Sequence, residues 1–415
     1  MDKSLQIRQS LKNTAEKRKN QQCKVRICKI QNNHLSKDKK DYLIRLFLEA
    51  KWFYNWILSQ EDIFKVDYKQ KEITILNKDK QQEKRNIIYL SSQTRQAILS
   101  RIQSNIKSLS TNKKNGKNVG KLNFVSYVSS IPLKQNNNTH KIIGNYLKLQ
   151  GYKNKFKING TQQIKGEIAN ANLIKKSSGY YINITTFEDK EEKEYNKDFI
   201  GFDFGIKDNL IDNNGNRYNF VFKETNKLKK YSKKLNRLER LRKKHNIKNS
   251  NRKIKIKEKL KKQYEKQNNK KKDTINNFIN NLKKYKIVVI QDENLSGWHK
   301  SKMKGWGKKI QHSIMGGIKS KIKSLETSII VDKFFPSTQL CPKCGCLNKH
   351  SLDKRVYSCQ CGYSFDRDTH SAINILIEGL KIFLQRKNTM DSEIKTSIKN
   401  FLDKFMIVDE SSQMF

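Results

Sequence analysis

The spacing of apolar residues predicts helices and strands in the first part of the chain. Residues 1–21 are polar and basic, which is typical of a flexible or helical arm. Residues 24–30 alternate apolar and polar side chains and predict a half-buried strand. From residue 43 to 58, apolar and aromatic residues recur every three or four positions, which predicts an amphipathic helix. Ser91 or Ser92 is placed to cap a second helix.

The pattern changes to short strand-like runs between residues 121 and 188, with clusters of Asn and Gly between them. These runs predict a β-rich module, to which the N-terminal strand can belong. The acidic and polar residues 188–197 are the predicted linker. After them, residues 199–206, a turn at 213–216 and a third short strand predict the opening β-meander of a new domain.

A long basic segment, residues 223–285, has a helical pattern that is broken near residues 246–251, so we expect two helices. The segment fits a solvated helical hairpin, and it equally fits an arm that faces nucleic acid. Residues 287–290 are a continuous apolar run, which predicts a strand buried on both faces of a mixed or parallel sheet. Residues 389–415 predict a short amphipathic tail.

Composition adds a partner class to this outline. A chain of 415 residues with 35% apolar residues can form two or three domains with their own cores. The formal net charge is +49, from 88 Lys and Arg against 39 Asp and Glu, and such a field favours a distributed polyanion as partner. An AT-rich genome would explain part of the lysine content but not its concentration in residues 223–285. Nucleic acid is therefore the expected partner.

A membrane is not an expected partner, because the sequence has no apolar run of about 18 residues and no signal-peptide pattern. We expect a soluble protein in the reducing cytoplasm of a prokaryote, associated with the nucleoid when it binds DNA.

Five of the seven cysteines fall within residues 341–361, with the spacing of metal ligands rather than that of a disulfide framework. Four thiolates favour a tetrahedral zinc ion with every position filled, which is a structural site. The expected ligands are Cys341, Cys344, Cys359 and Cys361. Because one residue separates the second pair, Cys346 or His350 is an alternative ligand, and a redox disulfide is the alternative to a metal.

A first candidate for catalysis lies in the predicted strand at residues 200–205. Alternation places Asp203 and its two flanking glycines on one face and two phenylalanines on the other. The missing side chains would leave room beside the carboxylate for a metal ion and a phosphate. An exposed polar residue on an edge strand is the alternative, but it would not need glycine on both sides.

Two further acidic clusters are candidates to act together with Asp203. Asp292 and Glu293 follow the buried strand, at the end where sites of α/β sheets usually lie. Asp366 and Asp368 begin a predicted helix, where either could also be an N-cap or a first-turn acid. Carboxylates suit Mg²⁺ because this ion prefers oxygen ligands and keeps several waters. Three separated acidic positions can converge on two Mg²⁺ ions about 3.5–4 Å apart, an arrangement suited to phosphodiester hydrolysis.

Four motifs of the chain occur in the order in which they stand in a known family. They are Ile200–Lys207, Val289–Leu295, Pro336–Gly345 and Cys361–Ala372. This set resembles the transposon-encoded TnpB proteins and their descendants, the miniature type V CRISPR effector nucleases. The strong resemblance covers residues 198–380.

The resemblance implies an RNA-guided DNA endonuclease with a RuvC-like site. The implied catalytic residues are Asp203, Glu293 and Asp368, which would hold two catalytic Mg²⁺ ions. Glu293 is preferred to its neighbour Asp292 because Glu-Asn-Leu stands where the family has Glu-Asp-Leu. The chain departs from the family after the last Asp, where His370 and Ser371 replace the usual Asn-Ala.

The implied fold class combines α/β and α+β domains. It comprises an RNase H-like (RuvC) domain with an inserted zinc-binding module, an N-terminal β-barrel-like wedge domain and a helical recognition domain. The expected domains are the arm and first wedge strand (1–40), the recognition domain (41–120), the wedge domain (121–190), the first RuvC-like part (191–335), the zinc module (336–364), the last RuvC-like part (365–388) and the tail (389–415).

The implied partners are a guide RNA, derived from a transposon or a CRISPR array, and double-stranded target DNA with a short adjacent motif. One guide RNA would be bound by a monomer or a homodimer. The expected nucleic-acid contacts are Trp298, Trp306, Lys300, position 241 and Arg252, the two tryptophans as stacking surfaces for bases.

Two other functions fit the same features. A guide-dependent DNA-binding regulator would use the basic surface without cutting, and a guide-independent resolvase would cut branched DNA without RNA.

Overall fold

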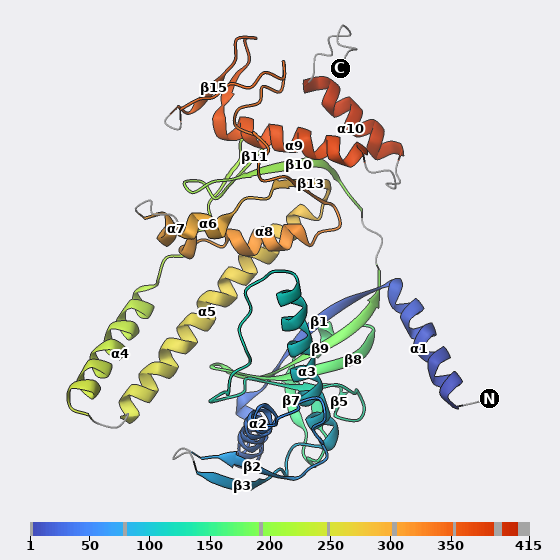
Figure 1. The fold of residues 1–415 in the computed structure, drawn as a ribbon, viewed down its shortest axis with the longest axis vertical. Coiled ribbons are helices and arrows are strands. Elements are labelled where there is room, and N and C mark those ends of the chain that lie inside the picture. The colour runs from blue at the N-terminus through green and yellow to red at the C-terminus, as the bar shows by residue number, and fades with distance from the viewer. Residues whose placement is uncertain are drawn as a thin grey trace. The chain divides into compact units, whose positions relative to one another are not determined.

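The computed structural model describes residues 3–77, 81–190, 194–246, 250–300, 305–351, 354–385 and 392–405. The chain divides into two compact units, Met1–Glu192 and Lys193–Phe415 (Figure 1). The division falls inside the segment 188–197 that the sequence predicts as a linker. Strands occupy both ends of that segment, because β9 (Gly179–Asp189) and β10 (Lys197–Phe204) are longer than their apolar patterns indicate.

The first unit is built on a seven-stranded antiparallel sheet in the order β4-β8-β9-β1-β7-β6-β5. Its strands are β1 (Gln21–Ile30), β4 (Ser130–Leu133), β5 (His140–Ile143), β6 (Tyr146–Leu149), β7 (Phe156–Asn159), β8 (Glu167–Lys176) and β9. The N-terminal strand β1 lies at the centre, between β9 and β7, so it belongs to the β-rich module as the sequence allowed.

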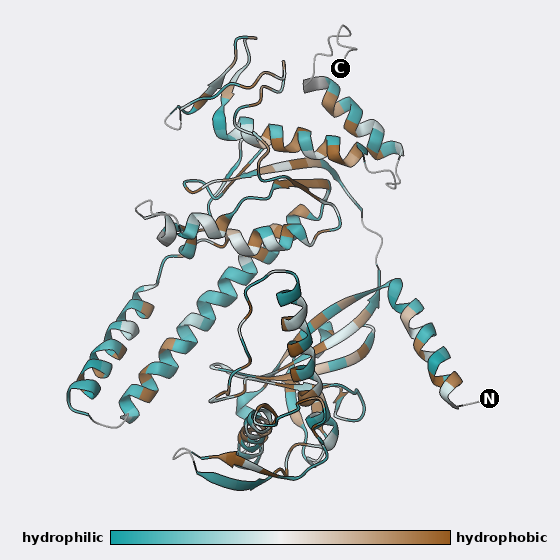
Figure 2. Cartoon of the chain, in the orientation of Figure 1, coloured by the Kyte–Doolittle hydropathy of each residue, from teal (hydrophilic) through white to brown (hydrophobic). Residues whose placement is uncertain are grey.

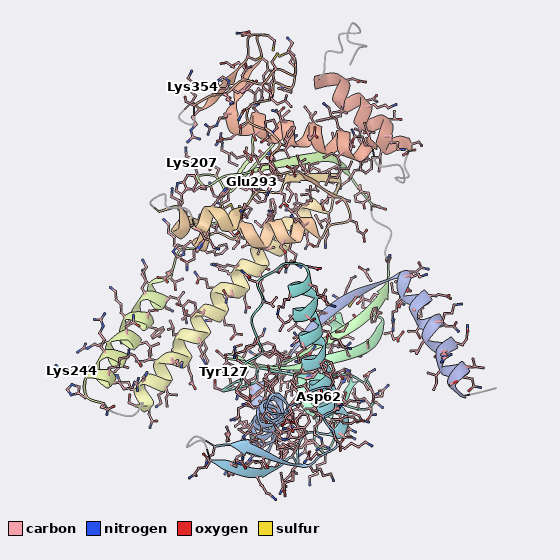
Figure 3. The ribbon with its side chains drawn as sticks, in the orientation of Figure 1. Asp62, Tyr127, Lys207, Lys244, Glu293 and Lys354 are labelled. Atoms are coloured by element: carbon pink, nitrogen blue, oxygen red, sulfur yellow. The ribbon has the colours of Figure 1, made fainter. Side chains whose placement is uncertain are left out.

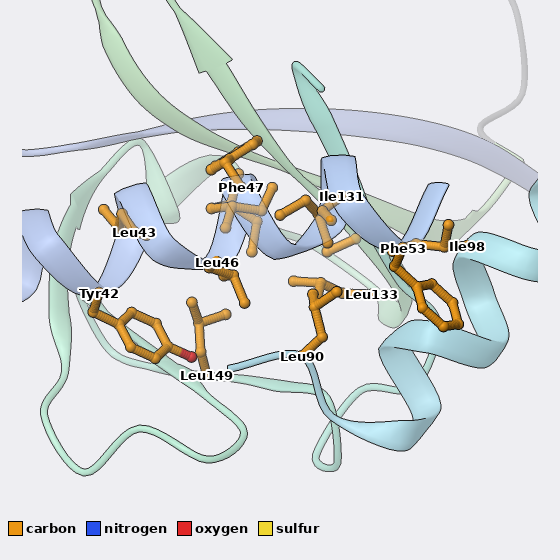
Figure 4. Close-up of a cluster of buried hydrophobic side chains, with 14 of the residues drawn as sticks. Tyr42, Leu43, Leu46, Phe47, Phe53, Leu90, Ile98, Ile131, Leu133 and Leu149 are labelled. Atoms are coloured by element: carbon orange, nitrogen blue, oxygen red, sulfur yellow. The ribbon is translucent and has the colours of Figure 1, made fainter. Parts of the chain in front are cut away.

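Among its described residues, this unit also contains the helices α1 (Lys3–Lys19), α2 (Lys37–Leu58) and α3 (Ser92–Lys114). Two 3-10 turns occur at Asn32–His34 and Thr161–Gln163. The hydroxyl of Ser91 accepts the N–H of Thr94 at 3.3 Å, so α3 begins at the cap that the sequence predicts. The apolar face of α2 packs into the core, where the side chains of Leu43 and Phe53 are fully buried (Figure 4).

A buried carboxylate fixes the segment that leads into α3. Glu49, on the buried face of α2, accepts the backbone N–H groups of residues 88, 89 and 90 at 3.0, 2.7 and 3.0 Å. Burial raises the pKa of Glu49, and the three N–H groups oppose that rise. Glu49 therefore stabilises the connection between two parts of the unit that are 40 residues apart in sequence.

The hairpin of β2 (Glu72–Leu76) and β3 (Gln82–Asn86) was not predicted. The stretch 65–88 is mostly charged and polar, and Ile73 is the one buried residue of the two strands among the residues described. A strand that buries so little leaves almost no alternation for the sequence to show.

The second unit is built on a five-stranded sheet in the order β12-β11-β10-β13-β14. β10 pairs in parallel with β13, and β13 with β14, whereas β10, β11 and β12 form an antiparallel meander. The remaining strands are β11 (Leu210–Asp212), β12 (Arg217–Tyr218), β13 (Tyr285–Gln291), β14 (Ser328–Val331), β15 (Val356–Ser358) and β16 (Ser364–Asp366). The helices are α4 (Asn226–Lys244), α5 (Asn251–Leu282), α6 (Leu295–Lys300), α7 (Trp306–His312), α8 (Met315–Lys323), α9 (Arg367–Gln385) and α10 (Ser392–Phe405).

Helices cover both faces of this sheet (Figure 1). Phe202 and Ile290 point to one face and pack with residues of α5 and α8. Phe199 and Val289 point to the other face and pack with residues of α9 and α10. This unit is therefore a three-layer α/β structure, and β13 is buried on both faces as predicted.

α4 and α5 form a hairpin that is polar along most of its length (Figure 2). Lys244, at the end of α4, lies near the tip of this hairpin (Figure 3). Most basic side chains of the two helices are exposed, as expected for the segment 223–285. Among the residues that the structure describes, no helix is both long and apolar enough to cross a lipid bilayer.

Candidate active site and metal centre

Asp203 stands on β10, on the face of the sheet that α9 covers. Its neighbours Phe202 and Phe204 point into the opposite core, as alternation predicts. The role expected of the glycines is wrong, however. A Cβ on Gly201 would lie 2.6 Å from the Cβ of Leu376, and one on Gly205 would lie 2.5 Å from a turn carbonyl. The glycines therefore allow close packing of α9 and a tight turn, and they do not open room for a metal ion and a phosphate.

The two acids that follow β13 differ in their surroundings. The Asp292 carboxylate forms ion pairs with the ammonium groups of Lys319 and Lys323, both at 2.6 Å. These contacts lower the pKa of Asp292 to about 2. Glu293 is half-buried, and burial raises its pKa against the opposing charge of Lys319. Glu293 lies beside the sheet of the second unit (Figure 3), and its charge acts on Asp203. Glu293, and not Asp292, is therefore the acid that the structure brings to Asp203.

Asp366 and Asp368 have different roles at the start of α9. Asp366 accepts both the backbone N–H and the hydroxyl of Thr369 at 3.0 Å, so it caps the helix. Asp368 lies in the first turn, and its charge also acts on Asp203. Three arginines surround the Asp368 carboxylate: Arg367 at 3.3 Å, Arg355 at 3.5 Å and Arg217 at 3.7 Å.

The three acids Asp203, Glu293 and Asp368 therefore come together from β10, from the end of β13 and from α9. Burial, followed by repulsion from the other two carboxylates, raises the pKa of Asp203 to about 7. A divalent cation bound between these groups would relieve the repulsion, and oxygen ligands are those that Mg²⁺ prefers. The donor set thus fits Mg²⁺.

A chain of hydroxyl groups connects Asp203 to the loop after β14. The Ser371 hydroxyl lies beside Asp203, whose pKa it lowers, and donates to the hydroxyl of Ser337 at 2.9 Å. Ser337 in turn donates to the side-chain carbonyl of Gln291 at 3.1 Å. All three polar residues are buried. Sequence reasoning did not find this chain, although Ser371 was visible as a departure from the family pattern.

The four cysteines expected to bind zinc lie together. Among the residues described, Cys341, Cys344, Cys359 and Cys361 are the group of potential ligands whose donor atoms all lie within 4.8 Å of one another. Two of the sulfur–sulfur distances are 3.5 and 3.6 Å. A tetrahedral zinc ion with bonds of about 2.3 Å would separate its sulfurs by about 3.8 Å. The cluster therefore fits one zinc ion.

Two thiols of the cluster differ in pKa, and burial raises the pKa of Cys341 to about 12. The backbone N–H of Cys361 is the main cause that lowers the pKa of Cys359 to about 6, which favours a thiolate. Cys346 is exposed and, like His350, lies outside the group of four, so the one-residue spacing of the second pair needs no substitute ligand. Among the residues described, the ligand atoms of the three carboxylates do not all lie within 4.8 Å of one another, unlike those of the four cysteines.

The cysteine cluster is joined to α9 by buried contacts. Asn374 on α9 donates to the carbonyls of Ser337 and Leu340 at 2.7 Å, just before Cys341. The His370 ring stacks on Tyr357 of β15 with 3.8 Å between the ring centroids. These contacts fix the start of α9, and with it Asp368, relative to the cluster.

The residues expected to contact nucleic acid differ in their exposure. Trp298 is packed against the core, which leaves it less free to stack on bases than expected, and Trp306 at the start of α7 is half-buried. Lys300 and Arg252 are exposed. Position 241 was expected to carry a basic contact, but it is Leu241, 42% exposed, so a basic contact there would have to come from its neighbours.

Arg217 was missed by sequence reasoning. It forms ion pairs with Asp208 at 2.8 Å and with Asp366 at 3.1 Å, beside Asp368. An arginine after an Asn-Gly turn gives no signal of such a role in the sequence, because its partners are up to 149 residues away.

Comparison with known proteins finds similarity in the region of the cysteine cluster. Residues 318–375 match a protein family described as Cas12f1-like, TNB domain. A protein of Streptomyces pristinaespiralis named "Putative RNA-guided DNA endonuclease" is 43% identical over 53 residues, which are 12% of this chain and 13% of that relative. The family match includes the four cysteines, Asp368 and Ser371. The chain is therefore similar to the TnpB/Cas12f-like family, as its motifs indicated.

Proposed function

We propose that this protein is an RNA-guided DNA endonuclease that cuts both target strands at one RuvC-like site. The observation that carries the proposal is that the charges of Glu293 and Asp368 act on Asp203, with Asp368 inside a region similar to a Cas12f1-like domain. The strand order of the second unit supports an RNase H-like fold. It places a three-stranded meander beside two parallel strands, with Asp203 on the central strand β10.

The three carboxylates would act together in the reaction. Asp203, Glu293 and Asp368 would hold two Mg²⁺ ions, which supply an activated water and stabilise the leaving 3′ oxygen of the phosphodiester. Ser371 would favour the charged form of Asp203, whose pKa it lowers. Arg217 offsets the charge of the acids that crowd the start of α9.

The partners follow from the basic surface and from the family. We propose that a guide RNA pairs with the target strand, so that base pairing determines the sequence that is cut and the protein contacts backbone and shape. The exposed lysines and arginines of α4 and α5 are suited to such backbone contacts. The guide would come from a transposon end or from a CRISPR array, and sequencing the RNA that copurifies with the protein distinguishes the two.

Cleavage by the copurified complex tests the proposal. A matched duplex should be cut in Mg²⁺, and Asp203→Ala should lower the rate about 1000-fold because one of the three carboxylates that would hold the ions is lost. Asp198→Asn is the matched control, because Asp198 begins the same strand but is exposed and paired with Lys286. Equal rates for the wild type and Asp203→Ala would contradict the proposal.

The alternative, a DNA-binding regulator, gives a different result in the same experiment. At protein concentrations that saturate binding, it would leave the matched duplex uncut in Mg²⁺. Binding measured beside cleavage therefore separates the two functions.

A further inference from the structure

The loop between β14 and the cysteine cluster is held in one conformation by a buried side chain. The side-chain N–H groups of Gln291 donate to the backbone carbonyls of Asp332, Lys333 and Phe335 at 3.0, 3.4 and 2.8 Å. Gln291 is 3% exposed. A buried amide that binds three carbonyls of one loop fixes its backbone, because leaving those groups unpaired would be costly.

This loop presents two successive phenylalanines in opposite directions. Phe335 packs against the core between the sheet and α9. Phe334 is 80% exposed, more than any other large apolar side chain among the residues described. The carboxylate of Asp332 accepts the N–H of Phe334 at 2.7 Å, so the exposed residue is itself held by a local turn. Single exposed apolar residues are common on proteins, and this one stands on a backbone that buried Gln291 fixes from within.

The loop that carries Phe334 lies beside the candidate active site. The N–H of Asp292 bonds to the carbonyl of Val331, which places the start of the loop beside the acids after β13. The end of the loop reaches Asp203 through Ser337 and Ser371. The ring therefore stands at the edge of the sheet where the carboxylates lie.

The side chain of Lys333 lies close to the Phe334 ring. The Lys333 ammonium lies 4.5 Å from the centroid of the Phe334 ring. An aromatic face with an adjacent positive charge matches one nucleotide, which offers a base to stack on the ring and a phosphate to pair with the ammonium. Paired bases inside a duplex cannot offer their faces, so the matching partner is a single strand.

We propose that Phe334 is a stacking surface for an unpaired nucleobase of a single strand, and that Lys333 pairs with its phosphate. The claim that this strand is the one being cut rests on the proposed function. The claim that Phe334 binds single strands does not.

Binding by the full-length protein tests the proposal. Affinities for a short single-stranded DNA and for the corresponding duplex would be measured at about 0.3 M salt, where charge attraction to the rest of the basic surface is weakened. Phe334→Ala should weaken binding of the single strand about five- to tenfold, at the lower end of base stacking on an aromatic ring, and leave the duplex unchanged. Phe334→Trp should keep the affinity, and Leu347→Ala, another exposed apolar residue of this unit, should change neither.

Photocrosslinking locates the contact. A single strand that carries 5-iododeoxyuridine should crosslink to the peptide containing Phe334, as found by mass spectrometry. The proposal is overturned if Phe334→Ala changes both affinities equally or not at all, or if the crosslinks map elsewhere. If the wild type and Asp203→Ala both leave DNA uncut while the crosslink at Phe334 persists, the proposed function fails and the stacking surface stands.

Discussion

Asp203→Asn should stabilise the metal-free protein, although it should abolish cleavage. The carboxyl group has a pKa of about 7 in the folded chain against an ordinary value of 3.8, because it is buried and repelled by Glu293 and Asp368. Between these two pH values the folded state holds a proton that the unfolded state has released. Stability therefore falls as the pH rises from about 4 to about 7, and the whole loss is present above pH 7.

The size of the effect follows from the pKa. A difference of 1 in pKa corresponds to 1.36 kcal/mol, so the loss at pH 8 is about 4 kcal/mol. An amide at position 203 has nearly the same shape as the carboxylate and carries no charge. Asp203→Asn should thus raise the free energy of unfolding of the second unit by up to about 4 kcal/mol at pH 8 and change it little at pH 4.

Urea denaturation from pH 4 to pH 8 in the presence of a chelator measures this difference, with hydrogen exchange of β10 and β13 to assign the transition to the second unit. Asp292→Asn is the matched control with the opposite sign. Its ion pairs with Lys319 and Lys323 lower its pKa to about 2, so its removal should destabilise the protein above pH 4. The carboxylates do not repel one another as described if Asp203→Asn leaves the free energy of unfolding at pH 8 unchanged, or if it raises that free energy more at pH 4 than at pH 8.

Three other changes test the remaining contacts. Chelation of the metal, or Cys344→Ser, should lower the melting temperature of the second unit, and elemental analysis of the wild type should find one zinc ion per chain. Ser371→Ala should weaken Mn²⁺ binding severalfold in calorimetry, at the sites that Asp203→Asn removes, because the Asp203 carboxylate loses a polar neighbour that lowers its pKa. Glu49→Ala should cost the first unit about 3 kcal/mol in urea denaturation, since three buried N–H groups lose their acceptor, and Glu49→Gln should cost less.

Much of the second unit could be predicted because its elements carry strong periodic signals. β13 buries both faces and therefore appears as an unbroken apolar run, and α9 has a well-defined apolar face behind its acidic first turn. The hairpin of β2 and β3 could not be found in this way, because it buries almost nothing and its residues have no reason to alternate.

Side-chain partners were the harder part of the candidate site. The sequence places Asp203, Glu293 and Asp368 on suitable elements, but it does not show that Lys319 and Lys323 pair with Asp292 and so leave Glu293 for Asp203. Such pairs join residues that are far apart in the chain. Local periodicity carries no information about them, whereas the packing of α8 beside β13 determines them.

The misjudged glycines explain how the three acids come together. Gly201 lets α9 approach β10 so closely that a side chain at position 201 would collide with Leu376. Gly379 lets the same helix approach Val289 of β13. A helix held this close by two strands brings its first residues, among them Asp368 and Ser371, to the carboxylate of Asp203.

The cysteine cluster also contacts the start of this helix. Asn374 binds the backbone of the segment that enters the cluster, and His370 stacks on its strand β15. Loss of the metal should therefore loosen the start of α9 before it affects the sheet, because close packing at the glycines holds the rest of the helix. Hydrogen exchange after chelation should rise first in residues 367–374, and a uniform rise across α9 and β10 would mean that the cluster supports the whole unit instead.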